Sequence, residues 1–165
     1  MRVYTARSAF VAFLTGLTLL LATLSAFAAD PFVGTWVLNS AKSKGLQGTI
    51  PDTSTLVITE LGGGRYKSVN DYKMLGIDVH AEVTFALDGR DYEVVQTSTQ
   101  AGALPIVQAF ERINEQSVKV TVKVGGDVVA TIIEELSADG RTLTATTSGI
   151  GQYASISNVT VLDKQ

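Results

Sequence analysis

Side chains alternate between apolar and polar with a period of two residues along most of the chain beyond Pro31, and this alternation constrains the fold most strongly. Residues 117–124 are the clearest case, with valine at every even position and serine, lysine or threonine at every odd one. Successive side chains of a β-strand point to opposite faces, so the pattern predicts a strand that is buried on one face and solvated on the other. Residues 79–87 alternate in the same way, with Phe85 on the apolar face.

Glycine-containing breaks separate the strand-like segments. Asp88-Gly89, Gly125-Gly126 and Asp139-Gly140 tolerate the positive φ angles that tight hairpin turns require. We expect ten strands, near residues 32–39, 55–60, 65–72, 79–87, 91–98, 106–113, 117–124, 128–136, 141–147 and 155–162. Only residues 40–47 suggest a helical turn, as a connector or a lid. The sequence therefore predicts an all-β fold, an antiparallel up-and-down β-barrel of about 8–10 strands, with a two-sheet β-sandwich as the alternative.

The first 28 residues have the features of a secretory signal peptide. Arg2 and Arg7 flank the start of an apolar run, and Ala26 and Ala28 are small residues of the kind that a signal peptidase recognises. An uncleaved membrane anchor is the alternative, because about 18 apolar residues can just span a bilayer. The small residues and the polar turn at Asp30 favour cleavage. We therefore expect an exported protein, periplasmic or secreted, with one domain at residues 29–165 and no transmembrane segment after cleavage.

The expected mature chain is acidic and contains no cysteine. Removing residues 1–28, with their two arginines, from 165 residues with 13 basic and 16 acidic side chains leaves 137 residues, 11 basic side chains and a formal charge of −5. Such a surface repels phosphate backbones, so nucleic acid is not an expected partner. A chain of this length can bury enough surface to fold without disulfides.

The mature chain opens with Phe-x-Gly-x-Trp, from Phe32 to Trp36. This segment resembles the first strand of lipocalins and fatty-acid-binding proteins, the calycin barrels, in which the tryptophan packs across the closed end. The wider opening, Gly-Thr-Trp-x-Leu-Asn-x-Ala-Lys-Ser-Lys, is similar to that of a group of uncharacterised exported bacterial proteins, as are residues 79–92, 110–113 and 137–144. The resemblance implies an exported, lipocalin-like β-barrel without an established activity.

The C-terminal segment departs from the calycin pattern. In that family an arginine typically packs against the tryptophan, and fatty-acid binders carry Arg-x-Tyr near the C-terminus. Residues 158–164 contain neither, which argues against a fatty acid anchored by its carboxylate.

The sequence does not point to catalysis. His80 is the single histidine, and it would share one strand face with Asp78 and Glu82. Such a group suits a partial metal site, but the solvated face of a strand explains it better, and we expect no metal or cofactor. The chain has no cysteine and no Gly-x-Ser-x-Gly elbow, and the adjacent Glu134 and Glu135 would point to opposite faces. We expect a protein that is not an enzyme.

Two functions remain. The first is binding of a small hydrophobic or amphipathic molecule in a cavity open at one end of the barrel. Its candidate ligand-binding residues are Trp36, Phe85, Tyr92, Phe110 and Arg112. The alternative is an envelope interaction or structural module that acts through its outer surface, with a filled core and an exposed apolar patch. Arg112 separates the two, since a buried arginine without a protein partner favours a ligand and a surface-paired one favours the module. Alanines 81, 130 and 145 are compatible with either a cavity or close packing.

Overall fold

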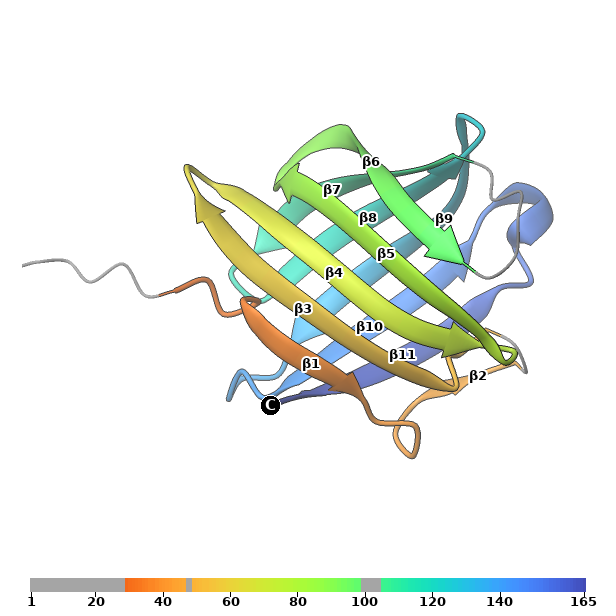
Figure 1. The fold of residues 1–165 in the computed structure, drawn as a ribbon, viewed down its shortest axis with the longest axis horizontal. Helices are drawn as coiled ribbons and strands as arrows, with labels where there is room; N and C mark the ends of the chain where they lie inside the picture. Colours follow the sequence, from red (N-terminus) through yellow and green to blue (C-terminus); the bar gives the residue numbers. More distant parts are fainter. Residues whose placement is uncertain (1–28, 47–48, 99–104) are drawn as a thin grey trace, which may run out of the picture.

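The structure is a computed structural model that describes residues 29–46, 49–98 and 105–165. The expected signal peptide, residues 1–28, lies outside the described residues. Strands make up most of the described chain, and they run antiparallel to their neighbours in one continuous sheet (Figure 1).

The ten long strands coincide with the ten segments expected from the alternation of side chains. They are β1 (Gly34–Leu38), β3 (Thr53–Gly62), β4 (Arg65–Met74), β5 (Ile77–Ala86), β6 (Asp88–Ser98), β7 (Ile106–Asn114), β8 (Ser117–Val124), β9 (Asp127–Leu136), β10 (Thr142–Gly149) and β11 (Ser157–Lys164). A further strand of two residues, β2 (Lys44–Gly45), was not expected. The prediction of an all-β fold is confirmed.

The sheet closes on itself. Each long strand pairs with the next along the chain, and β1 also pairs with β11, where Trp36 lies opposite Lys164 and Leu38 opposite Leu162. The short β2 pairs with the same edge of β11 as β1 does, nearer the start of β11, with Lys44 opposite Val159. The result is an antiparallel up-and-down barrel of ten strands, so the alternative of a two-sheet sandwich is wrong. Every long strand is paired on both sides along at least part of its length, although β5 and β6 pair over only four residues each. Closure thus reduces the unpaired edge that could recruit another strand.

Two hairpins show how the turn residues set the strand pairing. Gly125 and Gly126 join β8 to β9 with φ angles of 61° and 96°. Leu75 and Gly76 join β4 to β5 with φ angles of 52° and 78°. Two successive residues with positive φ give a turn whose twist matches that of the strands. Leu75 is the one residue other than glycine with a positive φ among the described residues, and its side chain is exposed.

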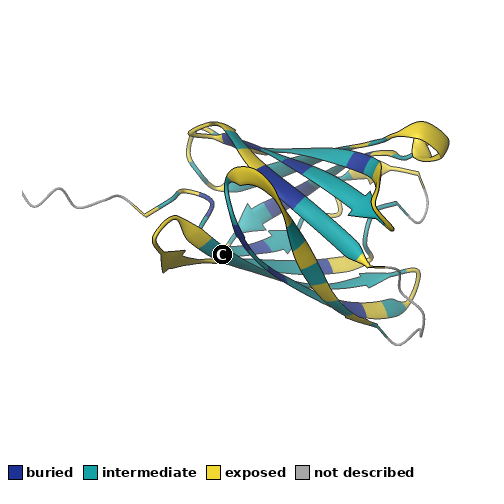
Figure 2. Ribbon diagram, turned by 90° about the horizontal axis from the view of Figure 1, so that it is seen from above, coloured by how far each residue is buried: buried dark blue, intermediate teal, exposed yellow. Residues whose placement is uncertain are grey.

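The apolar face of each strand points into the barrel. The buried cluster consists of Phe32, Trp36, Ile58, Val83, Phe85, Phe110, Val118, Val120, Leu136, Leu143 and Leu162. Buried positions occur at intervals along the strands, whereas exposed residues are concentrated at turns and on the outer face (Figure 2). The alternation that predicted the strands is therefore an alternation between the barrel interior and solvent.

One end of the barrel is closed by residues from both ends of the described chain. Trp36 is fully buried, and its indole Nε1 donates a hydrogen bond to the carbonyl oxygen of Phe32 at 2.9 Å. Lys164 places its Nζ 4.8 Å from the centroid of the Trp36 ring and donates to the carbonyl oxygen of Pro31 at 3.0 Å. A lysine thus occupies the place where the calycin resemblance implies an arginine.

The described residues of the connections at the opposite end contain little regular structure. Within the described part of residues 40–47, one turn, closed by a bond from Ser43 N to Asn39 O at 3.1 Å, leads into β2. A single 3-10 turn, η1 (Gly151–Tyr153), connects β10 to β11 and was not expected. No helix among the described residues is both long enough and apolar enough to cross a membrane.

Candidate functional site

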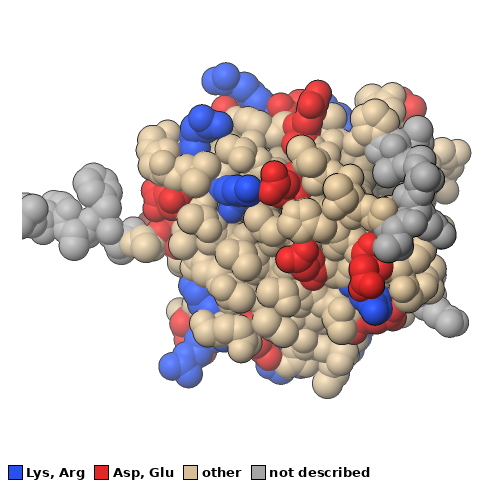
Figure 3. Space-filling view, in the orientation of Figure 1, with Lys and Arg blue, Asp and Glu red and all other residues tan. Residues whose placement is uncertain are grey.

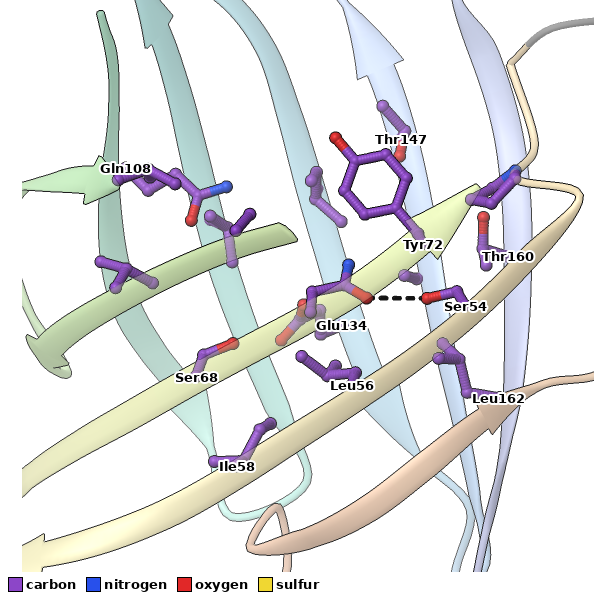
Figure 4. Close-up of a pocket in the computed structure, with 18 of the residues that line it drawn as sticks. Ser54, Leu56, Ile58, Ser68, Tyr72, Gln108, Glu134, Thr147, Thr160 and Leu162 are labelled. Atoms are coloured by element: carbon purple, nitrogen blue, oxygen red, sulfur yellow. Dashed lines mark hydrogen bonds between the residues drawn. The ribbon is translucent and has the colours of Figure 1, made fainter. Parts of the chain in front are cut away.

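The barrel encloses a cavity of about 320 Å³. It extends from Phe85 and Phe110 in the buried cluster to Thr49, Pro51 and Met74 at the end opposite Trp36. Its walls come from every long strand except β1 (Figure 4). The volume is at the lower end of the range for small-molecule sites, about 300–1,000 Å³.

Apolar side chains form most of the cavity wall. They are Leu56, Ile58, Met74, Val83, Phe85, Val94, Ile106, Phe110, Val120, Ile132, Leu143 and Leu162. Ala81 and Ala145 also line the cavity, so two of the small inward residues border open space. The alternating strands place these side chains inside because the opposite face of each strand meets water.

Polar side chains interrupt this wall on several strands. Ser54 donates a hydrogen bond from Oγ to Oδ1 of Asn70 at 2.8 Å, the contact marked in Figure 4. Gln96 donates from Nε2 to the Tyr72 hydroxyl at 3.4 Å, and burial raises the pKa of Tyr72. Further polar groups at the wall are those of Ser68, Gln108, Thr147, Asn158 and Thr160. A few polar groups in an apolar pocket are the usual means by which a protein orients a ligand.

Glu134 on β9 carries its carboxylate into this interior. It shares the inward face of its strand with Ile132, and it lines the cavity (Figure 4). No side chain of the described residues donates a hydrogen bond to the Glu134 carboxylate or forms an ion pair with it. Burial raises the pKa of Glu134 from 4.5 to about 7, because the low-dielectric interior disfavours the charged form.

Two of the five residues expected to bind a ligand lie at the cavity. Phe85 and Phe110 are both buried there, and their rings stack with centroids 3.8 Å apart. Tyr66 also stacks on Phe85, with a centroid distance of 5.7 Å. The rings of Phe85 and Phe110 form the inner end of the cavity, toward the closed end.

The other three expected residues belong to the closed end or to its surroundings. Trp36 packs beneath the cavity without lining it. Tyr92 packs against the buried cluster and donates its hydroxyl to Oδ1 of Asp88 at 3.0 Å. Arg112 forms a partly buried ion pair with Asp30, and its guanidinium carbon lies 5.3 Å from the centroid of the Phe32 ring. The arginine is therefore already paired by the protein.

The histidine and its neighbours lie on the outside of the barrel. Each of these β5 side chains contacts a partner on the neighbouring strand β4. Asp78 pairs with Lys73 at 3.2 Å and Glu82 with Lys67 at 2.7 Å. His80 Nδ1 lies 2.6 Å from Asp71 Oδ1. Each of the three side chains has its own partner instead of converging on one point. Among the described residues, no group of three or more histidine and acidic side chains is placed to hold a metal ion.

Glu134 was missed as a site residue, although the sequence contains a signal for it. Positions 130, 132, 134 and 136 of the expected strand read Ala, Ile, Glu and Leu, so one carboxylate interrupts an apolar face. The inward row of β4, which includes Ser68, Asn70 and Tyr72, gives the same signal. A polar residue on a buried face needs a partner, and a cavity is one place where such a partner can bind.

Comparison with solved structures places this architecture in a known fold. Fatty-acid-binding protein 1 of Echinococcus granulosus superposes with a TM-score of 0.59 at 20% identity, over 82% of this chain and 98% of that one. The fatty acid binding protein of Schistosoma mansoni, solved in complex with arachidonic acid, gives a TM-score of 0.57 at 16% identity, over 82% and 97%. The fold is a calycin barrel. A mutant of the fluorescent protein UnaG is also similar, with a TM-score of 0.56 at 14% identity, over 84% and 99%.

At these identities the likeness concerns the calycin barrel itself and not its ligand. No protein-family model matches the chain, and no curated protein sequence matches it. The resemblance of the opening segment to exported bacterial proteins stays a prediction.

Proposed function

We propose that the protein is an exported, lipocalin-like binding protein that holds one small hydrophobic or amphipathic molecule inside its barrel, without catalysis. The observation that carries this proposal is the cavity of about 320 Å³, whose wall is mostly apolar and carries polar side chains on several strands. Burying an apolar ligand there removes its surface from water, which stabilises the complex by about 25 cal/mol per Å² before the costs of association. The polar groups would fix its orientation.

The structural neighbours support a binding function of this type. Two of them are fatty-acid-binding proteins, and one of these was solved with arachidonic acid. The alignments cover nearly the whole length of both proteins, so the likeness includes the entire ligand-enclosing barrel. A long-chain molecule or a compact one of similar volume is the class of ligand that such a barrel accommodates.

Export and the absence of catalysis rest on different observations. Export to the periplasm or the medium is supported by the basic start, apolar run and small residues of positions 1–28. A non-catalytic role is supported by the position of His80, whose ring is outside the barrel and paired with Asp71. An imidazole there cannot reach a molecule held in the cavity.

The outer surface gives less support to the alternative of an interaction module. The exposed large apolar side chains of the described residues do not form one patch on the barrel wall. Leu61 and Ile113 lie near hairpins at the closed end, Val95 lies on β6, and the others lie at the connections of the opposite end, where the cavity reaches the surface: Leu46, Leu75, Val128, Ile150 and Tyr153. The face in Figure 3 carries basic and acidic groups in alternation with neutral surface. The pairing of Arg112 with Asp30 favours the interaction module, because that arginine is not available to a ligand.

Native mass spectrometry of the mature protein, purified gently from its own host, tests the proposal. We expect a reproducible adduct of a few hundred daltons that disappears on extraction with organic solvent. The same spectrum tests export, because cleavage after Ala28 fixes the mass of the polypeptide. A chain that stays free of adduct and fails to take up any apolar probe contradicts the binding proposal and directs attention to crosslinking in the envelope.

A further inference from the structure

Among the described residues, the wall of the cavity contains no basic side chain. None of the lining residues in this part of the chain is lysine, arginine or histidine. Two acidic residues border it, but the carboxylate of Glu82 turns outward to Lys67, at 2.7 Å. Glu134 is therefore the one acidic side chain at the wall that lacks a cationic partner in the described structure.

The nearest inward-facing cation is already engaged. Arg112, Val118 and Glu134 lie side by side across β7, β8 and β9, so Arg112 is two strands from Glu134, about 10 Å away. Arg112 pairs with Asp30 and donates to the carbonyl oxygen of Glu115 at 3.5 Å. Tyr66 donates its hydroxyl to the same Asp30 carboxylate at 2.9 Å. Four charged or titratable side chains of the described residues surround Glu134 inside the barrel. Three lie toward the closed end, Asp30, Tyr66 and Arg112, and the fourth is Tyr72 at the cavity wall.

Glu134 lies at the inner end of the cavity. It borders both the main cavity and a small void of about 20 Å³ beneath it, which Phe32, Phe85 and Phe110 also line. A ligand that enters from the end opposite Trp36 would meet Glu134 with its leading group. The rest of the ligand would lie along the apolar wall.

A carboxylate in this position selects among ligands by charge. Buried carboxylates are stabilised by cationic or hydrogen-bond-donating partners and destabilised by a second negative charge. We propose, on the basis of the binding function proposed above, that the cavity takes an amphipathic amine, whose ammonium group pairs with Glu134 and whose apolar part fills the barrel. A fatty acid of equal chain length would place its carboxylate against that of Glu134 or leave it unpaired among apolar side chains.

Competition between three ligands that share one chain tests this inference. Dodecylamine, dodecanol and dodecanoate, each at a concentration at which it is monomeric in solution, compete at pH 8 for the cavity against the uncharged fluorescent probe N-phenyl-1-naphthylamine. We expect the mature protein to bind dodecylamine at least about tenfold more tightly than dodecanoate, which corresponds to about 1.4 kcal/mol. Glu134→Gln should abolish that preference.

Glu135→Gln is the matched control. Glu135 is the next residue on β9 and is exposed on the outer face, so its substitution removes the same charge from the molecule without altering the cavity. We expect this variant to keep the preference for dodecylamine. Equal or tighter binding of dodecanoate by the unsubstituted protein overturns the amine inference, as does an equal effect of the two substitutions. Failure of the probe and of all three ligands to bind overturns the binding function itself, and the two failures are thereby distinguished.

Discussion

Glu134 and Glu135 are consecutive on β9 and lie on opposite sides of the barrel wall, one at the cavity and the other exposed to solvent. The pleat of the strand produces this separation, since adjacent side chains point to opposite faces. Two glutamates that are adjacent in the sequence thus have different environments, the barrel interior for Glu134 and solvent for Glu135. The inner one has a pKa raised to about 7 by burial.

Because burial raises the pKa of Glu134, we expect Glu134→Gln to stabilise the protein, and to do so more at high pH than at low pH. The pKa of Glu134 is higher in the folded state, about 7, than the ordinary value of 4.5, so the folded state holds the proton more tightly. The ligand-free protein therefore loses stability through this group as the pH rises from about 4.5 to 7. Glutamine is uncharged throughout, and the variant should exceed the unsubstituted protein in free energy of unfolding by about 2–3 kcal/mol at pH 8. Urea unfolding at pH 4.5 and pH 8 measures this difference.

The same unfolding series on Glu135→Gln provides the control. An exposed carboxylate at that position should change the free energy of unfolding by less than about 0.5 kcal/mol at both pH values. A gain for Glu134→Gln that is the same at pH 4.5 and pH 8 would mean that ionisation of Glu134 is not its cause.

The Asp30–Arg112 pair predicts that Asp30 stabilises the closed end. Asp30 accepts hydrogen bonds from Arg112, from the Tyr66 hydroxyl at 2.9 Å and from the backbone N of Phe32 at 3.0 Å. Asp30→Asn leaves the partly buried guanidinium without a counter-charge, and we expect a loss of about 1.5–3 kcal/mol in the free energy of unfolding. Chemical denaturation of the mature protein measures this loss.

Asp91→Asn is the matched control for that experiment, because Asp91 also pairs with a cation, Lys123, at 2.8 Å. The Asp91 side chain is about half exposed, and ion pairs of this kind contribute about 0–1 kcal/mol. Equal losses from the two substitutions would show that the closed end does not depend on its ion pair more than the outer surface does.

We expect the replacement of Leu75 in the β4–β5 hairpin by asparagine to stabilise the protein. Its φ of 52° lies in the left-handed region, which is unfavourable for leucine and which asparagine adopts more readily, and its exposed side chain gains little from packing. Asparagine is preferred before glycine in turns of this type, so Leu75→Asn should raise the free energy of unfolding by about 0.5–1 kcal/mol. Thermal unfolding followed by circular dichroism measures the gain.

Leu61, near the end of β3, separates conformational strain from the effect of removing an exposed leucine. It is also exposed but does not have a positive φ. Leu61→Asn should therefore change stability by less than about 0.5 kcal/mol. A gain as large as that of Leu75→Asn would assign the effect to lost apolar exposure instead of to turn geometry.

The strands could be predicted from sequence because their signal is local. The valines of residues 117–124 identify a strand and its buried face without any knowledge of its neighbours. Trp36 could be assigned to the closed end by its motif. Its partner Lys164 could not, because contact between the two depends on the pairing of β1 with β11 across nearly the whole chain.

The cavity could not be predicted from the sequence, because it too depends on contacts between residues that are far apart in the chain. Whether Ala145 marks a void or a close contact depends on which side chains face it across the closed barrel, and no local pattern contains that information. Arg112 was expected to bind a ligand because it shares a strand face with Phe110. It pairs instead with Asp30, 82 positions earlier in the chain, a contact that no local pattern shows. Glu134 was visible as an anomaly in an apolar row, but its meaning depended on the presence of the cavity.

Filling the cavity from Ala145 should remove binding without disturbing the fold. Ala145 lies opposite Glu134 in the pairing of β9 with β10 and lines the cavity. Ala145→Leu adds three heavy atoms to open space, so the barrel should retain its circular dichroism spectrum and its stability. The affinity for N-phenyl-1-naphthylamine should fall at least about tenfold, since the ligand and the added side chain would compete for one volume of about 320 Å³. Thr146→Leu adds a leucine one residue later on the opposite face of the strand and should leave that affinity unchanged. Equal binding by the Ala145→Leu protein would mean that the probe occupies another surface, whereas a selective loss would place the ligand inside the barrel.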